Sequence, residues 1–187
     1  MADELKGKRI LILATNGFEQ SELEVPRDKL KAAGATVDVV SPEAGEIKGW
    51  DNKNWGSSVK VDKKLSEAKV ADYDAIVLPG GQMNPDILRV NKDAVALVKA
   101  FFDAGKTIAA VCHAPWLLIE AGLASGRKMT SYKSIKTDVI NAGAKWEDSA
   151  VVTDHGIITS RQPADLDAFC AKIVEEVREG KHVRKAA

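Results

Sequence analysis

Cys112 and His113 are the two adjacent residues of this sequence best suited to nucleophilic chemistry. The apolar run TIAAVC ends at Cys112 and is typical of a buried strand, and HAPWLLIEAGL follows it directly and is typical of a helix. A strand that turns at once into a helix exposes the side chain at the corner and surrounds it with backbone N–H groups. The N-terminus of a helix also favours thiolate over thiol. We therefore expect Cys112 to be a nucleophile with a lowered pKa.

The alternative interpretation of Cys112 is a small buried hydrophobic residue, which is the role of most free cysteines. Its place at the end of the strand, rather than within it, favours the functional interpretation. Cys170 lies on the apolar side of the last predicted helix, and we expect it to belong to the core. Two cysteines are too few for a disulfide framework or a structural zinc site. Both are expected to be free thiols, and we expect neither a metal nor another cofactor.

Three further groups are candidates to face the sulfur. His113 is a candidate general base or acid, and its backbone N–H together with that of Gly81 is a candidate oxyanion hole. The alternative for the PGG segment around Gly81 is a tight turn that ends a strand. Glu19, in NGFEQ, is expected at the neighbouring strand end, where a protonated carboxyl would donate a hydrogen bond to the thiolate. The alternative is a carboxylate that only stabilises a helix N-terminus.

The remaining histidines and the tryptophans carry weaker signals. His155, in a predicted hairpin turn, and His182, in the tail, are expected to be solvated. Trp50, Trp55 and Trp116 are candidates to line a pocket, with packing or subunit contacts as the alternative. No nucleotide-binding or metal-binding motif is present in the sequence.

Apolar strands that alternate with helices must position these groups. Strands are expected at 8–14, 36–41, 74–78, 107–112 and around 127–131, with a hairpin at 150–161. Helices are expected at 21–34, 93–106, 113–123, 134–143 and 164–179, an irregular excursion with short strands at 42–60, and a frayed tail after 180. Such alternation predicts a mostly parallel sheet covered on both faces, with the active crevice at the carboxyl ends of its strands.

The composition limits the partners. The 187 residues suit one domain, 1–187, with an ordered core of about 8–180, and 45% of them are hydrophobic. Lysine plus arginine and aspartate plus glutamate both number 27, so no net field attracts nucleic acid or an anionic membrane. The N-terminal residues lack the apolar segment of a secretory signal, and no apolar run is long enough to cross a bilayer. A cytoplasmic location is the expectation.

The segments NGFEQSE, LPGG and AVCHAP, in this order and spacing, resemble the PfpI-type intracellular proteases, as do SYKSIKTDVINAGAKW and VVTDHGIITSRQPADL. That family belongs to the class I glutamine amidotransferase-like superfamily, which also includes the parkinsonism-associated deglycase. The resemblance covers essentially the whole chain. It implies an α/β fold, a flavodoxin-like three-layer sandwich with a mostly parallel central sheet and a cysteine nucleophile elbow.

The resemblance also implies roles for individual residues. Cys112 would be the nucleophile, with His113 beside it and Glu19 hydrogen-bonded to the sulfur. In the protease-like members an acidic residue of a neighbouring subunit completes a Cys-His-acid triad, and Asp86 matches that position, which implies a homodimer or higher homo-oligomer. Two departures concern the pocket: CHAPW replaces the usual CHGPQ and puts Trp116 in the pocket wall, and PGGQMNPD is one residue longer, which alters the reach of Asp86.

The activity that the resemblance implies is that of a stress-protective, cysteine-dependent enzyme acting on carbonyl or acyl substrates. Its reaction would be peptide hydrolysis, removal of early glycation adducts from protein, or conversion of methylglyoxal to lactate. A thiolate, an oxyanion hole and an acid–base partner serve each of them. A rival hypothesis is a thiol redox sensor or chaperone in which Cys112 is reversibly oxidised. A third is an interaction module whose cysteine is unreactive.

Overall fold

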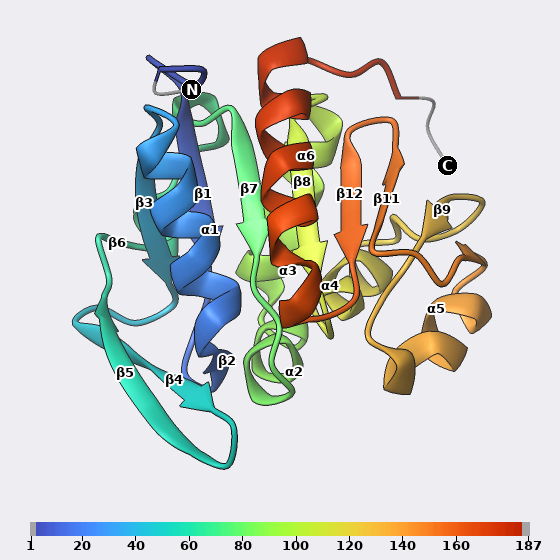
Figure 1. The fold of residues 1–187 in the computed structure, drawn as a ribbon, viewed down its shortest axis with the longest axis horizontal. Coiled ribbons are helices and arrows are strands. Elements are labelled where there is room, and N and C mark those ends of the chain that lie inside the picture. Colours follow the sequence, from blue (N-terminus) through green and yellow to red (C-terminus); the bar gives the residue numbers. More distant parts are fainter. Residues whose placement is uncertain (1–2, 185–187) are drawn as a thin grey trace.

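A seven-stranded central sheet organises the chain, and the computed structural model describes residues 3–184. Its strands are β1 (Arg9–Leu13), β3 (Thr36–Ser41), β6 (Lys63–Lys64), β7 (Ala75–Leu78), β8 (Thr107–Val111), β11 (Val151–Asp154) and β12 (Ile157–Ser160). They pair in the order β11-β12-β8-β7-β1-β3-β6 (Figure 1). Every pair is parallel except the hairpin of β11 and β12, so the predicted mostly parallel sheet is confirmed.

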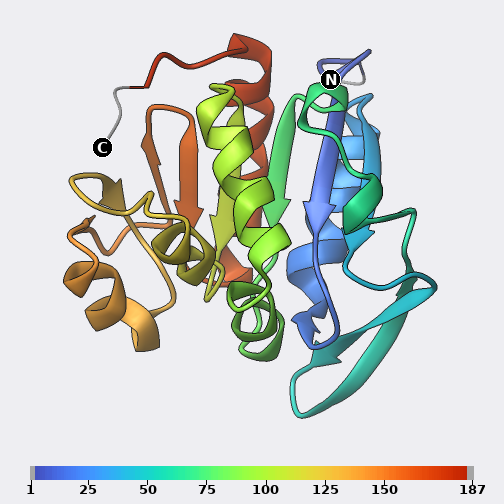
Figure 2. The same cartoon turned by 180° about the vertical axis from the view of Figure 1, so that it is seen from behind.

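Helices cover both faces of this sheet. They are α1 (Gln20–Ala32), α2 (Met83–Arg89), α3 (Lys92–Asp103), α4 (Pro115–Glu120), α5 (Lys136–Asn141) and α6 (Leu166–Glu179). Figure 1 shows α1 and α6 in front of the sheet, and Figure 2 shows α3 and α4 on the other face. Strand β1 explains the three layers: Ile10 and Ile12 pack in the core under α1 and α6, whereas Leu11 and Leu13 pack in the core under α3 and α4. A parallel strand that is buried on both sides needs this continuous apolar run.

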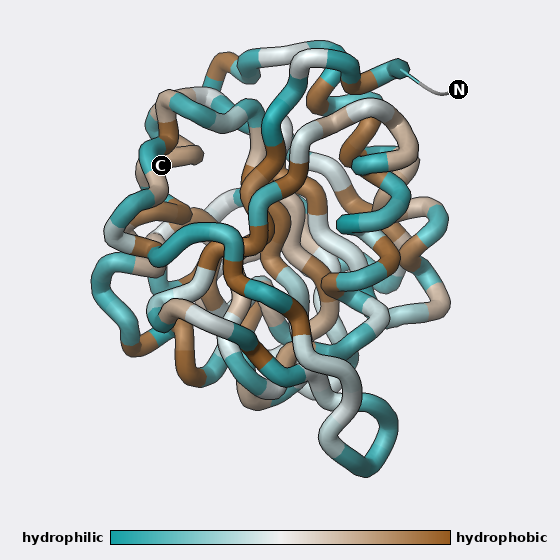
Figure 3. The backbone as a smooth tube through the Cα atoms, turned by 90° about the vertical axis from the view of Figure 1, so that its left-hand side faces the viewer, coloured by the Kyte–Doolittle hydropathy of each residue, from teal (hydrophilic) through white to brown (hydrophobic). Residues whose placement is uncertain are grey.

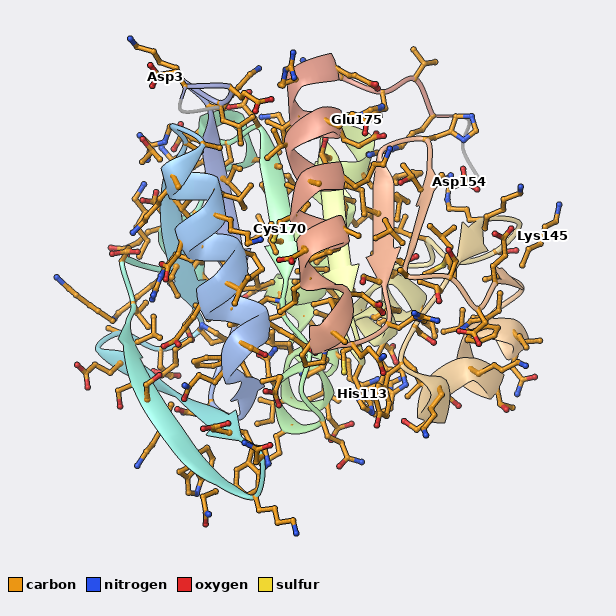
Figure 4. The ribbon with its side chains drawn as sticks, viewed as in Figure 1. Asp3, His113, Lys145, Asp154, Cys170 and Glu175 are labelled. Carbon is orange, nitrogen blue, oxygen red and sulfur yellow. The ribbon has the colours of Figure 1, made fainter. Side chains whose placement is uncertain are left out.

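The parallel strands all end at the same edge of the sheet. In Figure 1 the arrowheads of β3, β7, β8 and β12 point toward the edge at which α2 lies, and Figure 2 shows β1 pointing the same way. His113 is labelled at that edge in Figure 4. The hydropathy colouring in Figure 3 shows the most apolar stretches gathered in the middle of the molecule. Connections after β1, β7 and β8 are therefore the segments that the fold leaves free to carry chemistry.

The segment 42–60 is more regular than the sequence predicts. Strands β4 (Glu46–Asp51) and β5 (Asn54–Lys60) form an antiparallel hairpin, and β4 pairs with the short strand β2 (Phe18–Glu19). Trp50 and Trp55 pack edge to face across the hairpin, with ring centroids 5.5 Å apart. The two tryptophans thus pack against each other across the hairpin. This contact stabilises the paired strands although the polar residues around it have weak strand propensity. The last small sheet joins β9 (Lys128–Met129) to β10 (Lys145–Trp146).

The C-terminal segment differs in part from the predicted frayed tail. The His182 side chain is only 13% exposed, with Nε2 3.3 Å from the carboxylate of Glu176, and its backbone N–H donates to the carbonyl of Gly105. His182 is therefore not solvated, because the chain after α6 contacts the C-terminal end of α3, where Arg184 donates to the carbonyl of Phe102. Residues 185–187 lie outside the described residues. His155 has an exposed side chain, as predicted. Among residues 3–184, none of the helices combines the length and the apolar character needed to cross a bilayer.

Candidate active site

Cys112 lies at a strained corner directly after β8. Its φ angle is 64°, in the left-handed region that residues with a side chain rarely adopt. The surrounding backbone holds this conformation, because the Cys112 N–H donates to Ser160 at 3.0 Å and the Cys112 carbonyl accepts from Tyr132 at 2.8 Å. Strain that neighbours maintain in this way is typical of functional positions. The abrupt change from strand to helix in the sequence thus corresponds to a nucleophile elbow.

The sulfur of Cys112 is enclosed by polar groups. The nearest is His113 Nδ1, 3.1 Å from Sγ. The backbone amides of Gly81 and His113 lie near enough to the sulfur to lower the pKa of the thiol, so the structure brings together the two amides considered for an oxyanion hole. Cys112 is buried, with 6% of its surface exposed, at the margin of the core under α1 and α6. The site therefore offers a thiol, an imidazole and two amide donors around one position.

The carboxyl group at the sulfur comes from Glu22, not from Glu19. Glu22 is fully buried, its Oε2 accepts a hydrogen bond from the Gly80 N–H at 2.9 Å, and its carboxyl interacts with the Cys112 sulfur. Its second oxygen, Oε1, is buried without a hydrogen-bond partner within the part of the chain that the structure describes. A buried oxygen of this kind is far less costly when the carboxyl is protonated.

The side chain of Glu19 faces away from the sulfur for a local reason. Phe18 and Glu19 form β2, whose successive side chains point to opposite sides, and Phe18 is the buried one. The Glu19 carboxylate instead accepts a hydrogen bond from the Ser21 hydroxyl at 3.4 Å, and burial raises its pKa. The prediction of Glu19 as the partner of the sulfur is therefore wrong. Helical spacing offered a signal for the correct residue, because Glu22 shares the buried stripe of α1 with Pro26 and Leu30.

Burial sets the protonation of the three titratable groups. It raises the pKa of the Cys112 thiol, and the charge of Glu22 raises it further, while the amide of Gly81 opposes both effects. The predicted lowering of this pKa is therefore wrong, because burial dominates and α4, which begins only at Pro115, has just six residues. Burial also raises the pKa of Glu22 to about 8 and lowers the pKa of His113. Near pH 7 the site holds a protonated carboxyl, a thiol and a neutral imidazole able to accept the thiol proton.

His113 is held by residues that the sequence analysis did not single out. Its ring stacks on Tyr132, with centroids 4.9 Å apart, and meets the edge of Trp116 at 5.3 Å. Its Nε2 lies 3.0 Å from the hydroxyl of Ser134. Trp116 thus stands beside the catalytic candidates, as predicted for the pocket wall, and its Nε1 donates to Asp138. Tyr132 and Ser134 lie in the segment SYKSIKTDV that carries the family resemblance, but their distance of about twenty residues from His113 gave no sign that they contact it.

Asp86 is exposed in the first turn of α2. Among the described residues, the side-chain hydrogen bonds of His113 go to Cys112 and Ser134. The contribution of Asp86 from a neighbouring subunit stays a prediction. Cys170 is buried in the core beside α1, as expected, and Figure 4 shows it midway along α6, far from His113.

The metal-binding potential of the chain lies elsewhere. Among the described residues one group, Glu176, Glu179 and His182, places ligand atoms within 4.8 Å of one another. This group lies at the end of α6 opposite the edge that carries His113, and its pairing of Glu176 with His182 already explains the arrangement as an ion pair. The Cys112 site is thus built from thiol, imidazole, carboxyl and amide groups alone.

Gly80 separates Glu22 from Cys112, and a larger residue is expected to disturb both. An added Cβ would lie 2.6 Å from Glu22 Oε2, 2.7 Å from Cys112 Cβ and 2.7 Å from the carbonyl oxygen of Val111. We expect Gly80→Ala to lower the free energy of unfolding by about 1–3 kcal/mol through overpacking and to slow alkylation of Cys112. Thermal unfolding and iodoacetamide kinetics measure the two effects. Wild-type stability together with a wild-type alkylation rate would contradict the packing described here.

The fold and the site together define a class of doubly wound α/β proteins with a cysteine at the elbow between a central strand and a helix. A comparison with family models matches residues 8–176 to the DJ-1/PfpI family, and the chain belongs to this family. It is 43% identical over 167 residues to the deglycase PfpI of Pyrococcus furiosus, which covers 89% of this chain and 98% of that protein. It is 41% identical to the putative cysteine protease YraA of Bacillus subtilis and 40% identical to general stress protein 18 of the same organism. Each of these two matches covers 87% of this chain and 94% of the relative.

Solved structures agree with this assignment. The DJ-1beta structure of Drosophila melanogaster superposes with a TM-score of 0.81 and 30% identity, covering 96% of this chain and 95% of that one. A two-domain protein of Anabaena variabilis, with DJ-1/ThiJ/PfpI-like and ferritin-like domains, reaches a TM-score of 0.86 and 38% identity, covering 91% of this chain and 48% of that one. The expected flavodoxin-like fold is confirmed.

Proposed function

We propose that this protein is a cysteine hydrolase that removes early glycation adducts from amines, and that it protects protein during carbonyl stress. The observation that carries the proposal is the 3.1 Å contact between the Cys112 sulfur and His113 Nδ1, beneath two amide donors. Relatives named deglycase and general stress protein support the same reading. Because one relative is named a putative cysteine protease, peptide hydrolysis is the alternative activity that the experiment must distinguish.

The geometry suits attack on a carbonyl carbon. In an adduct of an amine with methylglyoxal, a proton first moves from the carbon that carries the amine and a hydroxyl to the neighbouring carbonyl carbon, which gives a lactoyl amide. A bond then forms from the Cys112 sulfur to the amide carbonyl carbon, the C=O electron pair moves to the oxygen, and the thiol proton passes to His113 Nδ1. The amides of Gly81 and His113 are placed to stabilise the alkoxide, and the protonated Glu22 is placed to donate to the thiolate. His113 then returns its proton to the amine as the C–N bond breaks, which leaves a lactoyl thioester on Cys112. Water hydrolyses this thioester to lactate and the free thiol.

The overall reaction consumes one water and releases the free amine and lactate. Oxidation of one carbon of the adduct is balanced by reduction of its neighbour, so the reaction needs no external oxidant. No cofactor is part of the proposal, in keeping with the chemistry of the side chains at the site.

A panel of substrates tests the proposal. The purified protein is incubated separately with methylglyoxal-treated N-acetylarginine, with free methylglyoxal, with a fluorogenic peptide and with hydrogen peroxide. We expect recovery of free N-acetylarginine together with stoichiometric lactate. Cleavage of the peptide alone would replace the proposal with a peptidase, and lactate from free methylglyoxal alone would replace it with a glyoxalase. No turnover of any substrate, combined with addition of oxygen to Cys112 by peroxide, would support the redox sensor instead.

A further inference from the structure

His113 uses both ring nitrogens, and each faces a different partner. Nδ1 lies 3.1 Å from the Cys112 sulfur, and Nε2 lies 3.0 Å from the Ser134 hydroxyl. A neutral imidazole carries one proton, so only one nitrogen is free to accept a proton from the thiol. The hydrogen bond at the remote nitrogen decides which one, because an acceptor there holds the proton away from the reactive side. The hydroxyl of Ser134 is the group at that remote nitrogen.

The position of Ser134 is tied to the nucleophile through the backbone. Ser134 belongs to a short 3-10 turn, Lys133–Ile135, that follows Tyr132 directly. The Tyr132 N–H donates to the Cys112 carbonyl at 2.8 Å, and the Tyr132 ring stacks on His113 at an interplanar angle of 26°. The segment from Tyr132 to Ser134 therefore makes three contacts: a backbone hydrogen bond to Cys112, a ring stacked on His113, and a hydroxyl next to His113 Nε2.

The aromatic contacts restrict rotation of the imidazole. Tyr132 covers one face of the ring, and Trp116 meets the ring edge-on, with centroids 5.3 Å apart and planes at 62°. Trp116 is in turn held by Asp138, which accepts from its Nε1 at 2.9 Å, and by Arg89, whose guanidinium lies 4.9 Å from its ring centre. With the ring plane fixed by packing, the thiol and the Ser134 hydroxyl each face one fixed nitrogen, so the hydroxyl can accept from Nε2–H while the thiol donates to Nδ1.

We propose that Ser134 is a positioning residue that completes a Cys112–His113–Ser134 relay within a single subunit. Its oxygen accepts the Nε2–H of His113, which leaves Nδ1 unprotonated and ready to take the thiol proton. When the sulfur attacks, that proton moves to Nδ1, and the imidazolium keeps its Nε2–H bond to the hydroxyl. The relay therefore forms without an acidic group from a neighbouring subunit. This inference rests on the proposed function only for the identity of the substrate.

A hydroxyl at this place has a consequence that a carboxylate would not have. Ser134 is neutral and adds no charge to offset the burial that lowers the pKa of His113. Tyr132 and Trp116 also meet the ring with uncharged surfaces, while Cys112 and the Glu22 behind it stay protonated near pH 7. A carboxylate in place of the hydroxyl is expected to raise the pKa of His113, so Ser134→Asp should move the acidic limb of the reactivity profile to higher pH.

The test measures the rate of Cys112 alkylation by iodoacetamide from pH 5 to 10 in a Cys170→Ala background, in which Cys112 is the sole cysteine. We expect Ser134→Ala to slow alkylation at pH 7 about five- to tenfold, the size of one lost neutral hydrogen bond. Ser134→Thr keeps the hydroxyl and should restore the rate, and Thr137→Ala, a nearby exposed hydroxyl, serves as the control. Nitrogen-15 NMR of His113 should show the Nε2–H tautomer in the wild type and a mixture of tautomers in Ser134→Ala.

Alkylation requires no substrate turnover, so it separates this inference from the proposed function. A protein that fails on every glycated substrate but shows the Ser134 effect loses the proposed function and keeps the relay. A wild-type rate and tautomer in Ser134→Ala, with slowed alkylation in Asp86→Asn, would overturn the relay in favour of an acid from a neighbouring subunit. Equal slowing in Ser134→Ala and Ser134→Thr, with no change of tautomer, would reduce Ser134 to a structural role.

Discussion

Cys112→Ala is expected to lower kcat/KM for a glycated amine by at least about 10³-fold, because the variant has no atom that can form the covalent bond to the carbonyl carbon. His113, the amides and the Glu22 carboxyl would remain and would support only weak binding of the substrate. Removal of this buried sulfur should leave the fold intact and cost about 1 kcal/mol of stability through a small cavity. Steady-state kinetics with release of the free amine as the readout, at pH 7, measures the loss.

Cys170→Ala provides the matched control for this experiment. Cys170 is also buried, and burial raises the pKa of its thiol to about 12, but the charged groups that act on it are Lys29 and Asp167 rather than the groups of the Cys112 site. Its loss is expected to change kcat/KM less than about twofold and to cost stability instead, about 1 kcal/mol for a small cavity. Retention of most of the activity in Cys112→Ala, or its loss in Cys170→Ala, would show that the chemistry lies elsewhere.

Glu22 is expected to make the stability of the protein fall between pH 5 and pH 9. Burial raises the folded-state pKa of this carboxyl from 4.5 to about 8, so the folded protein binds a proton that the unfolded chain has released. The stabilisation is therefore complete below pH 4.5 and is lost as the pH rises through 8. One pKa unit corresponds to about 1.4 kcal/mol, so the shift from 4.5 to about 8 makes the total loss on the order of 5 kcal/mol.

Glu22→Gln is the variant that isolates this effect. The amide has the shape of the protonated carboxyl and can still accept from Gly80, but it does not titrate. The pH dependence that remains in the variant belongs to other groups, such as Glu19 and Glu176, whose pKa values burial also raises. Urea unfolding at pH 5, 7 and 9 measures the difference between the two proteins. Parallel curves for wild type and variant over this range would mean that Glu22 is ionised in the folded state.

The sequence by itself determined the arrangement of elements and the identity of the nucleophile. Apolar strands without polar alternation, separated by helices that end at glycines, leave few architectures other than a covered parallel sheet. The direct passage from TIAAVC into HAPWLL placed Cys112 at a corner, and the glycines after β7 placed amides beside it. These are local features, because hydrophobic periodicity and backbone sterics act over a few residues.

Tertiary structure alone decided which groups meet the sulfur and in which protonation state. Glu22 rather than Glu19 contacts the sulfur because β2 pairs with β4. This pairing directs the Phe18 side chain into the core and the Glu19 side chain to the opposite side, before α1 begins. Ser134 reaches His113 because a backbone hydrogen bond ties Tyr132 to Cys112 across twenty residues of chain. The pKa of the thiol depends on burial by the whole fold, which outweighs the short helix that follows it. Contacts between distant segments and the exclusion of water have no local signature, which is why the sequence alone does not determine them.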